Sequence, residues 1–329
     1  MDISLQKKIM MDDSLFFNVY SKLEHKVIAF RKDIWSDLRD TEYRSWLDNF
    51  KDGDIERLNA LYLLSKFVYF GHLEINTMLQ SMYRDLYKYP IVAKIREHNN
   101  NTLNDKFIKK EFHAHLMSTR FFGVGEPSES GVHLLYYFRQ QNNLPESLFI
   151  NTHELFTYKY QDSVKQEVIT WSDPTINHVV FIDDFCGGGT QAIRYIKKTI
   201  EIIKDLNSNC EVDYFVLVAN EAGLDNVREN TQIDKLDAVF ILDESFKCFS
   251  EKSRYYANVD DPINKEFTKG MCEKYGKERS KDAGSAMGYS DNQLLLSFFH
   301  NTPNNTLPIF WTDAKGWYPM FKREIKRYK

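Results

Sequence analysis

The chain lacks the usual marks of a secreted, membrane-spanning or metal-clustered protein. No apolar stretch approaches the roughly 20 residues that a transmembrane helix requires, and residues 1–6 form no signal-peptide hydrophobic region. We therefore expect a cytoplasmic protein with no membrane association. Four cysteines occur without Cys-x-x-Cys spacing, which favours reduced thiols over a zinc site or a disulfide framework: Cys186, Cys210, Cys248 and Cys272.

An excess of positive charge is also missing. The 43 Lys and Arg residues against 47 Asp and Glu residues give a formal net charge of −4 at pH 7, so nucleic-acid binding is not indicated by net charge. The basic tail over residues 322–329 leaves a local contact with RNA or DNA open. A hydrophobic fraction of 43% in 329 residues predicts a folded protein of two domains, or one domain with large additions.

One segment, residues 178–192, specifies chemistry. Its apolar run from His178 to Ile182 is too short for a helix and is typical of a buried strand in a parallel sheet. Asp183 and Asp184 follow at the carboxyl end, where open α/β sheets bind ligands. Three glycines then allow a phosphate to approach backbone N–H groups, and Thr190 precedes an expected helix whose N-terminus attracts anions. The segment predicts an anion and a polyol bound side by side.

The spacing excludes two common phosphate loops. No Lys stands between Gly187 and Thr190, as a Walker A loop requires, and three consecutive glycines fit the dinucleotide fingerprint badly. The segment instead resembles the 5-phosphoribosyl-1-pyrophosphate (PRPP) binding motif of type I phosphoribosyltransferases, although Gly187 stands where that family usually has Thr or Ser. The resemblance implies that Asp183 and Asp184 hold the ribose hydroxyls, and that a loop holds the 5′-phosphate: Phe185, Cys186, Gly187, Gly188, Gly189 and Thr190.

A second turn rich in Gly, Pro and Ser lies between an expected strand (119–124) and an expected helix (132–142). Such a turn at a helix N-terminus is an anion site by geometry. A simple helix cap, with acids that complement the helix dipole, is the alternative. Two carboxylates also repel a pyrophosphate unless a divalent cation lies between them. The resemblance implies a pyrophosphate loop: Glu126, Pro127, Ser128, Glu129, Ser130 and Gly131.

The reaction that the resemblance implies needs Mg²⁺. Loss of pyrophosphate from ribose C1 passes through an oxocarbenium-like transition state, and Mg²⁺ neutralises the leaving group. We expect Asp184 to touch the metal indirectly, through its water shell. His153, Lys159 and Lys165 lie where the family carries a flexible lid; the alternative is that they are ordinary surface residues.

Two isolated features have simpler interpretations. Glu111, His113 and His115 fall in an expected helix, where side chains two residues apart do not converge, so we expect no structural metal site. Cys186 lies near a helix N-terminus that would make a thiol reactive, but a small apolar filler beside Phe185 is the favoured interpretation.

The pattern of elements indicates an α/β fold. Residues 5–117 show helical spacing with breaks at 51–54 and 97–102, and the remainder alternates strands with helices. Expected strands lie at 119–124, 147–151, 178–182, 212–220 and 238–242, with helices at 132–142, 191–205 and 223–229. We predict a Rossmann-like parallel sheet of the type I phosphoribosyltransferase kind, with an N-terminal helical domain (1–115), an α/β core (116–250) and a C-terminal hood (251–329).

The C-terminal third carries an unusual tract of Asn, Pro and aromatic residues. Together with the PRPP-like segment and the helical first third, it looks like PRTase-CE, the phosphoribosyltransferase-like family associated with bacterial conflict systems. The resemblance implies antiphage defence beside a partner such as a retron reverse transcriptase or a toxin–antitoxin component. Asn304, Asn305 and Trp311 could recognise a base through amide hydrogen bonds and stacking; a turn and core packing are the alternative.

Two functions follow as expectations. The first is binding of PRPP or another 5-phosphoribosyl nucleotide, with Mg²⁺-dependent glycosyl transfer or glycosidic-bond cleavage. The alternative is a non-catalytic nucleotide sensor or interaction component that regulates a partner toxin or nucleic-acid enzyme. The acceptor, the partner and homo-oligomer formation are left open by the sequence.

Overall fold

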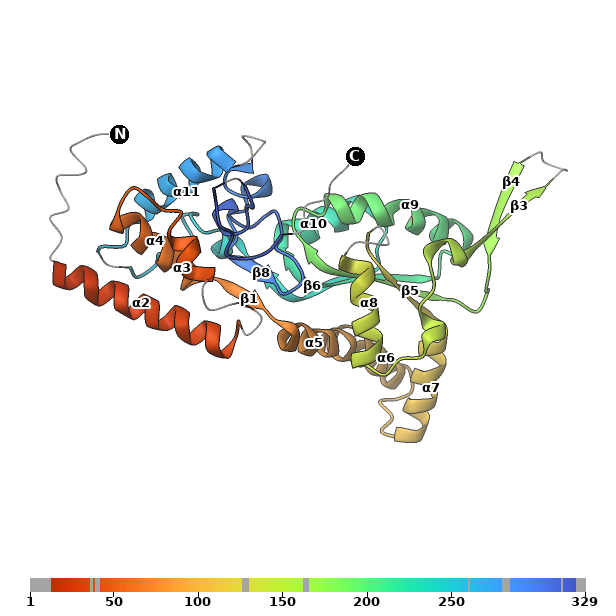
Figure 1. Cartoon of the computed structure of the whole chain (residues 1–329). Coiled ribbons are helices and arrows are strands. Elements are labelled where there is room, and N and C mark those ends of the chain that lie inside the picture. The colour runs from red at the N-terminus through yellow and green to blue at the C-terminus, as the bar shows by residue number, and fades with distance from the viewer. Residues whose placement is uncertain are drawn as a thin grey trace. The chain divides into compact units, whose positions relative to one another are not determined.

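A computed structural model describes residues 13–35, 38, 42–125, 130–161, 166–259, 261–279, 285–314 and 316–323 (Figure 1). Packing divides the chain into two compact units, Met1–His72 with Asp243–Lys329, and Leu73–Leu242. The helices between residues 73 and 115, which we placed in an N-terminal domain, therefore belong to the same unit as the parallel sheet. Among the described residues, no helix has both the length and the apolar character to cross a membrane.

The first unit packs helices on aromatic residues. Trp46 stacks on Phe310 with ring centroids 5.0 Å apart, and Phe67 stacks on Phe321 at 4.0 Å. The expected break at residues 51–54 separates α3 from α4 and contains Gly53, at φ 112°. Strands β1 (Val68–Phe70) and β8 (Leu296–Phe298) pair in parallel. The helical elements are α2 (Asp13–Asp33), α3 (Glu42–Leu47), α4 (Asp54–Leu64), η4 (Glu244–Phe246), α11 (Lys265–Arg279), η6 (Tyr289–Asp291) and η7 (Pro308–Phe310).

The second unit is built around a four-stranded parallel sheet in the order β2-β5-β6-β7. Apolar side chains on both faces keep β2, β5 and β6 largely buried, as is usual in parallel sheets, whereas Phe240 and Ile241 of β7 are exposed. The strands are β2 (Thr119–Gly123), β5 (His178–Cys186), β6 (Glu211–Asn220) and β7 (Lys235–Leu242). The helical elements are α5 (His72–Ser81), the π-helix η1 (Met82–Lys88), α6 (Tyr89–His98), α7 (Asp105–Met117), α8 (Ser130–Gln141), η2 (Glu146–Leu148), η3 (Thr152–Leu155), α9 (Thr190–Leu206) and α10 (Glu221–Asn230).

The α/β fold class is confirmed, but one expected strand is wrong. The stretch 147–151 forms no strand; residues 146–148 make a 3₁₀ turn, and Phe149 alone bridges in parallel to Phe121. The sequence analysis also did not predict an antiparallel hairpin between α8 and β5, formed by β3 (Phe156–Gln161) and β4 (Gln166–Trp171).

The chain leaves β2 and β5 toward opposite faces of the sheet. Phe138 of α8 packs on Phe121 with ring centroids 5.3 Å apart, whereas Ile196 of α9 shares a buried cluster with Phe122 and Phe181. Neighbouring residues of a strand point to opposite faces, so α8 and α9 cover different faces (Figure 1). Phe121 pairs with β5 on one side of β2 and bridges in parallel to Phe149 on the other side. The chain therefore crosses from one side of β2 to the other before β5, and the carboxyl ends there form a topological switch point, the usual ligand site of such sheets.

Candidate functional site at the switch point

Both loops that the sequence singled out begin at this switch point. The β2 and β5 strands pair in parallel with Gly123 opposite Ile182, and the Val124 N–H donates to the Ile182 carbonyl at 2.9 Å. The first loop therefore leaves the sheet beside the residue that precedes Asp183. The parallel sheet thus gathers two segments that are about 60 residues apart in the sequence.

The acid pair lies inside the strand, since β5 continues past the acids to Cys186. Asp183 and Asp184 keep only 8% and 7% of their surface exposed. Asp183 Oδ1 accepts a hydrogen bond from the Asp184 backbone N–H at 2.9 Å, and Oδ2 accepts one from the Tyr214 hydroxyl at 3.0 Å. The Asp183 carboxyl is thus held in place by the strand itself and by neighbouring β6.

The environment of Asp183 favours its protonated form. Burial raises the pKa of Asp183 well above its usual range, and the adjacent Asp184 carboxyl raises it further. The hydrogen bond from Tyr214 opposes this effect because it stabilises the carboxylate. Tyr214 was not predicted from the sequence as a site residue. Its one sequence signal is a side chain with a hydroxyl group in the apolar strand that follows the motif.

The glycine loop is packed tightly against α10. Gly189 adopts the left-handed conformation, at φ 77°, as the N-cap of α9. A Cβ added to Gly223 would lie 2.2 Å from the Gly187 carbonyl oxygen, so the loop and α10 meet backbone to backbone. The Asn226 side chain donates to the Gly188 carbonyl at 2.6 Å. These contacts fix the position of the turn at the N-terminus of α9.

Thr190 and Cys186 flank this turn in different environments. Thr190 is exposed at the first position of α9, where the backbone N–H groups of the first turn have no intrahelical acceptor. Its hydroxyl and these N–H groups are suited to a phosphate. Cys186 is buried, and burial raises the pKa of its thiol to about 12, with a smaller contribution from Asp183. This agrees with the filler interpretation and disfavours a reactive thiolate.

The second loop is described only at its ends. Gly131 lies in the first turn of α8, and a Cβ there would be 2.2 Å from the Val124 carbonyl oxygen, so the start of α8 lies tightly against the residue that follows β2. Ser130 begins α8. Glu126, Pro127, Ser128 and Glu129 lie outside the described residues. The pyrophosphate-binding role of this loop stays a prediction.

The expected lid region contains the β3–β4 hairpin. His153 and Lys159 are exposed, whereas Lys165 lies outside the described residues. Two further exposed aromatic side chains on β3, which the sequence analysis did not single out, are Tyr158 and Tyr160, at 49% and 65% exposure. The lid function of this hairpin stays a prediction.

The expected base-binding residues belong to the other unit. The Asn304 carbonyl accepts from the Tyr289 N–H at 2.7 Å, and Asn305 is buried with its carbonyl accepting from the Leu294 N–H at 3.1 Å. The Trp311 indole donates to the Thr306 carbonyl at 2.9 Å. All three therefore make internal contacts, and their role in binding a base stays a prediction.

The acid pair has the donor chemistry that Mg²⁺ prefers. Mg²⁺ takes oxygen ligands and keeps several waters, so one or two carboxylates suffice. The two adjacent, buried carboxylates need a cation nearby if both are to be ionised. Asp184 would hold the ion through its water shell, and the ion would neutralise negative charge on a bound pyrophosphate.

The switch point, the acid pair and the glycine turn define a phosphoribosyltransferase-like α/β protein. The model of the PRTase-CE family matches residues 43–323, so the chain belongs to that family. No curated protein matches.

Solved structures similar to this chain include two phosphoribosyltransferases. The AQ2163 protein of Aquifex aeolicus is 13% identical, with a TM-score of 0.26 over 70% of this chain and 96% of that one. The xanthine-guanine-hypoxanthine phosphoribosyltransferase of Helicobacter pylori is 9% identical, with a TM-score of 0.26 over 53% and 92%. The orotate phosphoribosyltransferase of Aeropyrum pernix is 16% identical, with a TM-score of 0.23 over 44% and 76%.

Proposed function

We propose that the chain binds PRPP or another 5-phosphoribosyl nucleotide at the switch point. The observation that carries this proposal is the placement of the acid pair and the glycine turn at the carboxyl end of β5, beside the loop that leaves β2. Asp183 and Asp184 would orient the ribose diol, and the turn from Gly187 to Thr190 would bind the 5′-phosphate. Carboxyl groups can accept hydrogen bonds from the ribose hydroxyls, and a helix N-terminus favours the phosphate.

The proposed reaction is Mg²⁺-dependent transfer or cleavage at ribose C1. The bond between C1 and the leaving group breaks, and its electron pair departs with the pyrophosphate oxygen or the base nitrogen. An oxocarbenium-like charge develops at C1 as this bond breaks. A nitrogen nucleophile or water then bonds to C1 and gives up its proton to solvent. The protein's part is to fix the ribose and to keep a negative charge near C1, which the acid pair would supply once a bound cation allows both carboxyl groups to ionise.

The biological setting that we propose is bacterial antiphage defence, as expected of a conflict-system family. The partner would be another component of the same defence system, such as a reverse transcriptase or a toxin–antitoxin protein. Co-expression with that partner, with and without the double substitution of Asp183 and Asp184 by Ala, tests this setting by phage plaque counts. Equal protection by the two forms would contradict it.

A second candidate, a nucleotide sensor without catalysis, is favoured by Gly187. Where PRPP-binding motifs usually offer a hydroxyl, this residue offers only backbone. Incubating the full chain with Mg²⁺ and PRPP, or with nucleoside monophosphates, and then measuring released pyrophosphate or free base separates the two candidates. Release that disappears in the acid-pair variant supports the enzyme, whereas binding without release supports the sensor. Asp205→Asn, an exposed carboxylate at the far end of α9, serves as the control.

A further inference from the structure

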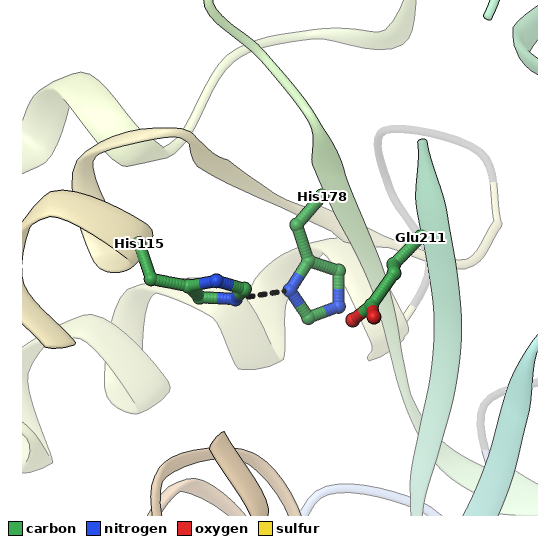
Figure 2. Close-up of side chains that lie close together, drawn as sticks. All are labelled: His115, His178 and Glu211. Carbon is green, nitrogen blue, oxygen red and sulfur yellow. Dashed lines mark hydrogen bonds between the residues drawn. The ribbon is translucent and has the colours of Figure 1, made fainter. Parts of the chain in front are cut away.

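A second cluster of polar side chains lies at the opposite edge of the same sheet. His178 is the first residue of β5, five residues before Asp183, or about 17 Å along the strand. Glu211 begins the neighbouring strand β6, and His115 lies in the last turn of α7. Figure 2 shows these three side chains pointing toward one another from three separate elements. One ligand atom of each lies within 4.8 Å of the others.

The backbone around the cluster is fixed by hydrogen bonds. The Asn177 N–H donates to the Ser118 carbonyl at 3.1 Å, and the Glu211 N–H donates to the Asn177 carbonyl at 2.9 Å. The Ser118 hydroxyl also donates to the Asn177 side chain at 2.6 Å. The end of α7 and the starts of β5 and β6 are therefore tied together. A site formed by these elements needs little ordering when a ligand binds.

A carboxylate already orients the imidazole ring of His178. His178 Nε2 lies 3.0 Å from Asp213 Oδ2, and both side chains are buried. When the His178 Nε2–H group donates a hydrogen bond to Asp213, Nδ1 is the unprotonated ring nitrogen. This Nδ1 atom lies 2.9 Å from His115 Nε2. A carboxylate behind a histidine that presents its other nitrogen is the usual outer-shell support of a metal-binding histidine.

The spacing of the nitrogens is close to what a metal requires. Zn–N bonds of about 2.05 Å at a tetrahedral angle place two nitrogens roughly 3.3 Å apart. The present 2.9 Å between His115 Nε2 and His178 Nδ1 would have to open by about 0.4 Å. We expect rotation of the half-buried His115 ring, at the end of its helix, to supply this change. The proton now shared by the two rings would leave, or move to His115 Nδ1.

The charges around the cluster are also compatible with a cation. Two carboxylates, those of Glu211 and Asp213, and the cationic Lys94 lie at the cluster. Lys94 occupies one carboxylate oxygen of Glu211 at 3.0 Å, and the second oxygen is left for a metal.

We propose that His115, His178 and Glu211 form a binding site for a divalent transition-metal ion of the Zn²⁺ class, with Asp213 as the positioning residue behind His178. Two imidazoles and one carboxylate select such an ion over Mg²⁺ or Ca²⁺, which prefer oxygen ligands. Three protein ligands leave the fourth tetrahedral position to water. The ion links α7 to β5 and β6 at the amino edge of the sheet, independently of the acid pair.

Zn²⁺ titration of the full chain tests this proposal. The chain is first stripped with a chelator and dialysed, and binding is then measured by calorimetry, with Co²⁺ absorption as a probe of nitrogen and oxygen coordination. We expect one Zn²⁺ per chain, with binding lost in His115→Ala and in Glu211→Gln. The Glu211→Gln variant retains an oxygen acceptor for Lys94 and so guards against a folding defect. Asp213→Asn should weaken Zn²⁺ binding about 10–100-fold.

The matched control is His113→Ala, which removes an exposed histidine from the same helix two residues away. It should bind Zn²⁺ and Co²⁺ as the unaltered chain does. If the unaltered chain fails to bind one Zn²⁺, the proposal is wrong. It is equally wrong if His115→Ala and Glu211→Gln bind Zn²⁺ as tightly as the His113→Ala control.

Discussion

Replacing Gly189 by alanine should destabilise the second unit strongly. Gly189 sits at φ 77°, and an added Cβ would lie 2.7 Å from the Gly223 carbonyl oxygen and 2.9 Å from a Val227 methyl group. The left-handed conformation costs a residue with a Cβ about 1–2 kcal/mol. Relieving the overlap with α10 costs about 1–3 kcal/mol more, because a backbone oxygen cannot rotate away. The lower entropy of the unfolded chain returns roughly 0.4–1 kcal/mol.

The expected loss of about 1–5 kcal/mol is a large part of a typical stability of about 5–15 kcal/mol. Urea denaturation measures it, with hydrogen exchange of the α9 amides as the probe of this unit. The adjacent Gly188 is the control, because a Cβ there meets no atom within 4 Å. Gly188→Ala should change the free energy of unfolding by only about 0.5 kcal/mol. Equal effects of the two substitutions would refute the described packing of the loop against α10.

Three further predictions concern β5 and the neighbouring strand β6. Tyr214→Phe removes the hydrogen-bond donor to buried Asp183 and should lower the free energy of unfolding by about 1–3 kcal/mol in urea denaturation. An unchanged free energy of unfolding would contradict the burial of this carboxyl group. Because folding raises the pKa of Asp183, the contribution of this residue to stability should fall as pH rises above about 4. Thermal unfolding measured across pH should show a smaller decrease of stability with pH in Asp183→Asn than in the unaltered chain. An equal decrease in the two proteins would contradict the raised pKa. Since burial raises the pKa of Cys186 to about 12, mass spectrometry should find it unalkylated by iodoacetamide in the native protein and alkylated in denaturant; rapid native labelling would count against this.

The sequence predicted the motif well because the information is local. A strand followed by two acids and three glycines lies within fifteen residues, and the alternation of helices and strands indicates that this strand belongs to a parallel sheet. The strand nonetheless continues to Cys186, since Phe185 and Cys186 pair with Val218 and Ala219 of β6. That extension depends on a partner strand, so no local pattern shows it.

Two features escaped the sequence analysis because they depend on contacts between distant segments, and a third could have been predicted. The stretch 147–151 has strand-like residues, but only Phe149 reaches Phe121, since the preceding residues turn in a 3₁₀ helix. The hairpin could have been found, since polar and apolar residues alternate through β3. His115 and His178 are 63 residues apart, and only the folded chain places them 2.9 Å from each other. Clusters of this kind are invisible to spacing rules.

Direct binding of PRPP with Mg²⁺ tests the central claim most directly. Calorimetric titration of the full chain should give saturable binding, and the double substitution of Asp183 and Asp184 by Ala should abolish it while Asp205→Asn leaves it unchanged. Ligand at a hundredfold excess over its dissociation constant should also stabilise the unaltered chain by about 2.7 kcal/mol in a thermal-shift assay. Binding that survives in the folded double variant would contradict a ribose-phosphate site at the end of β5.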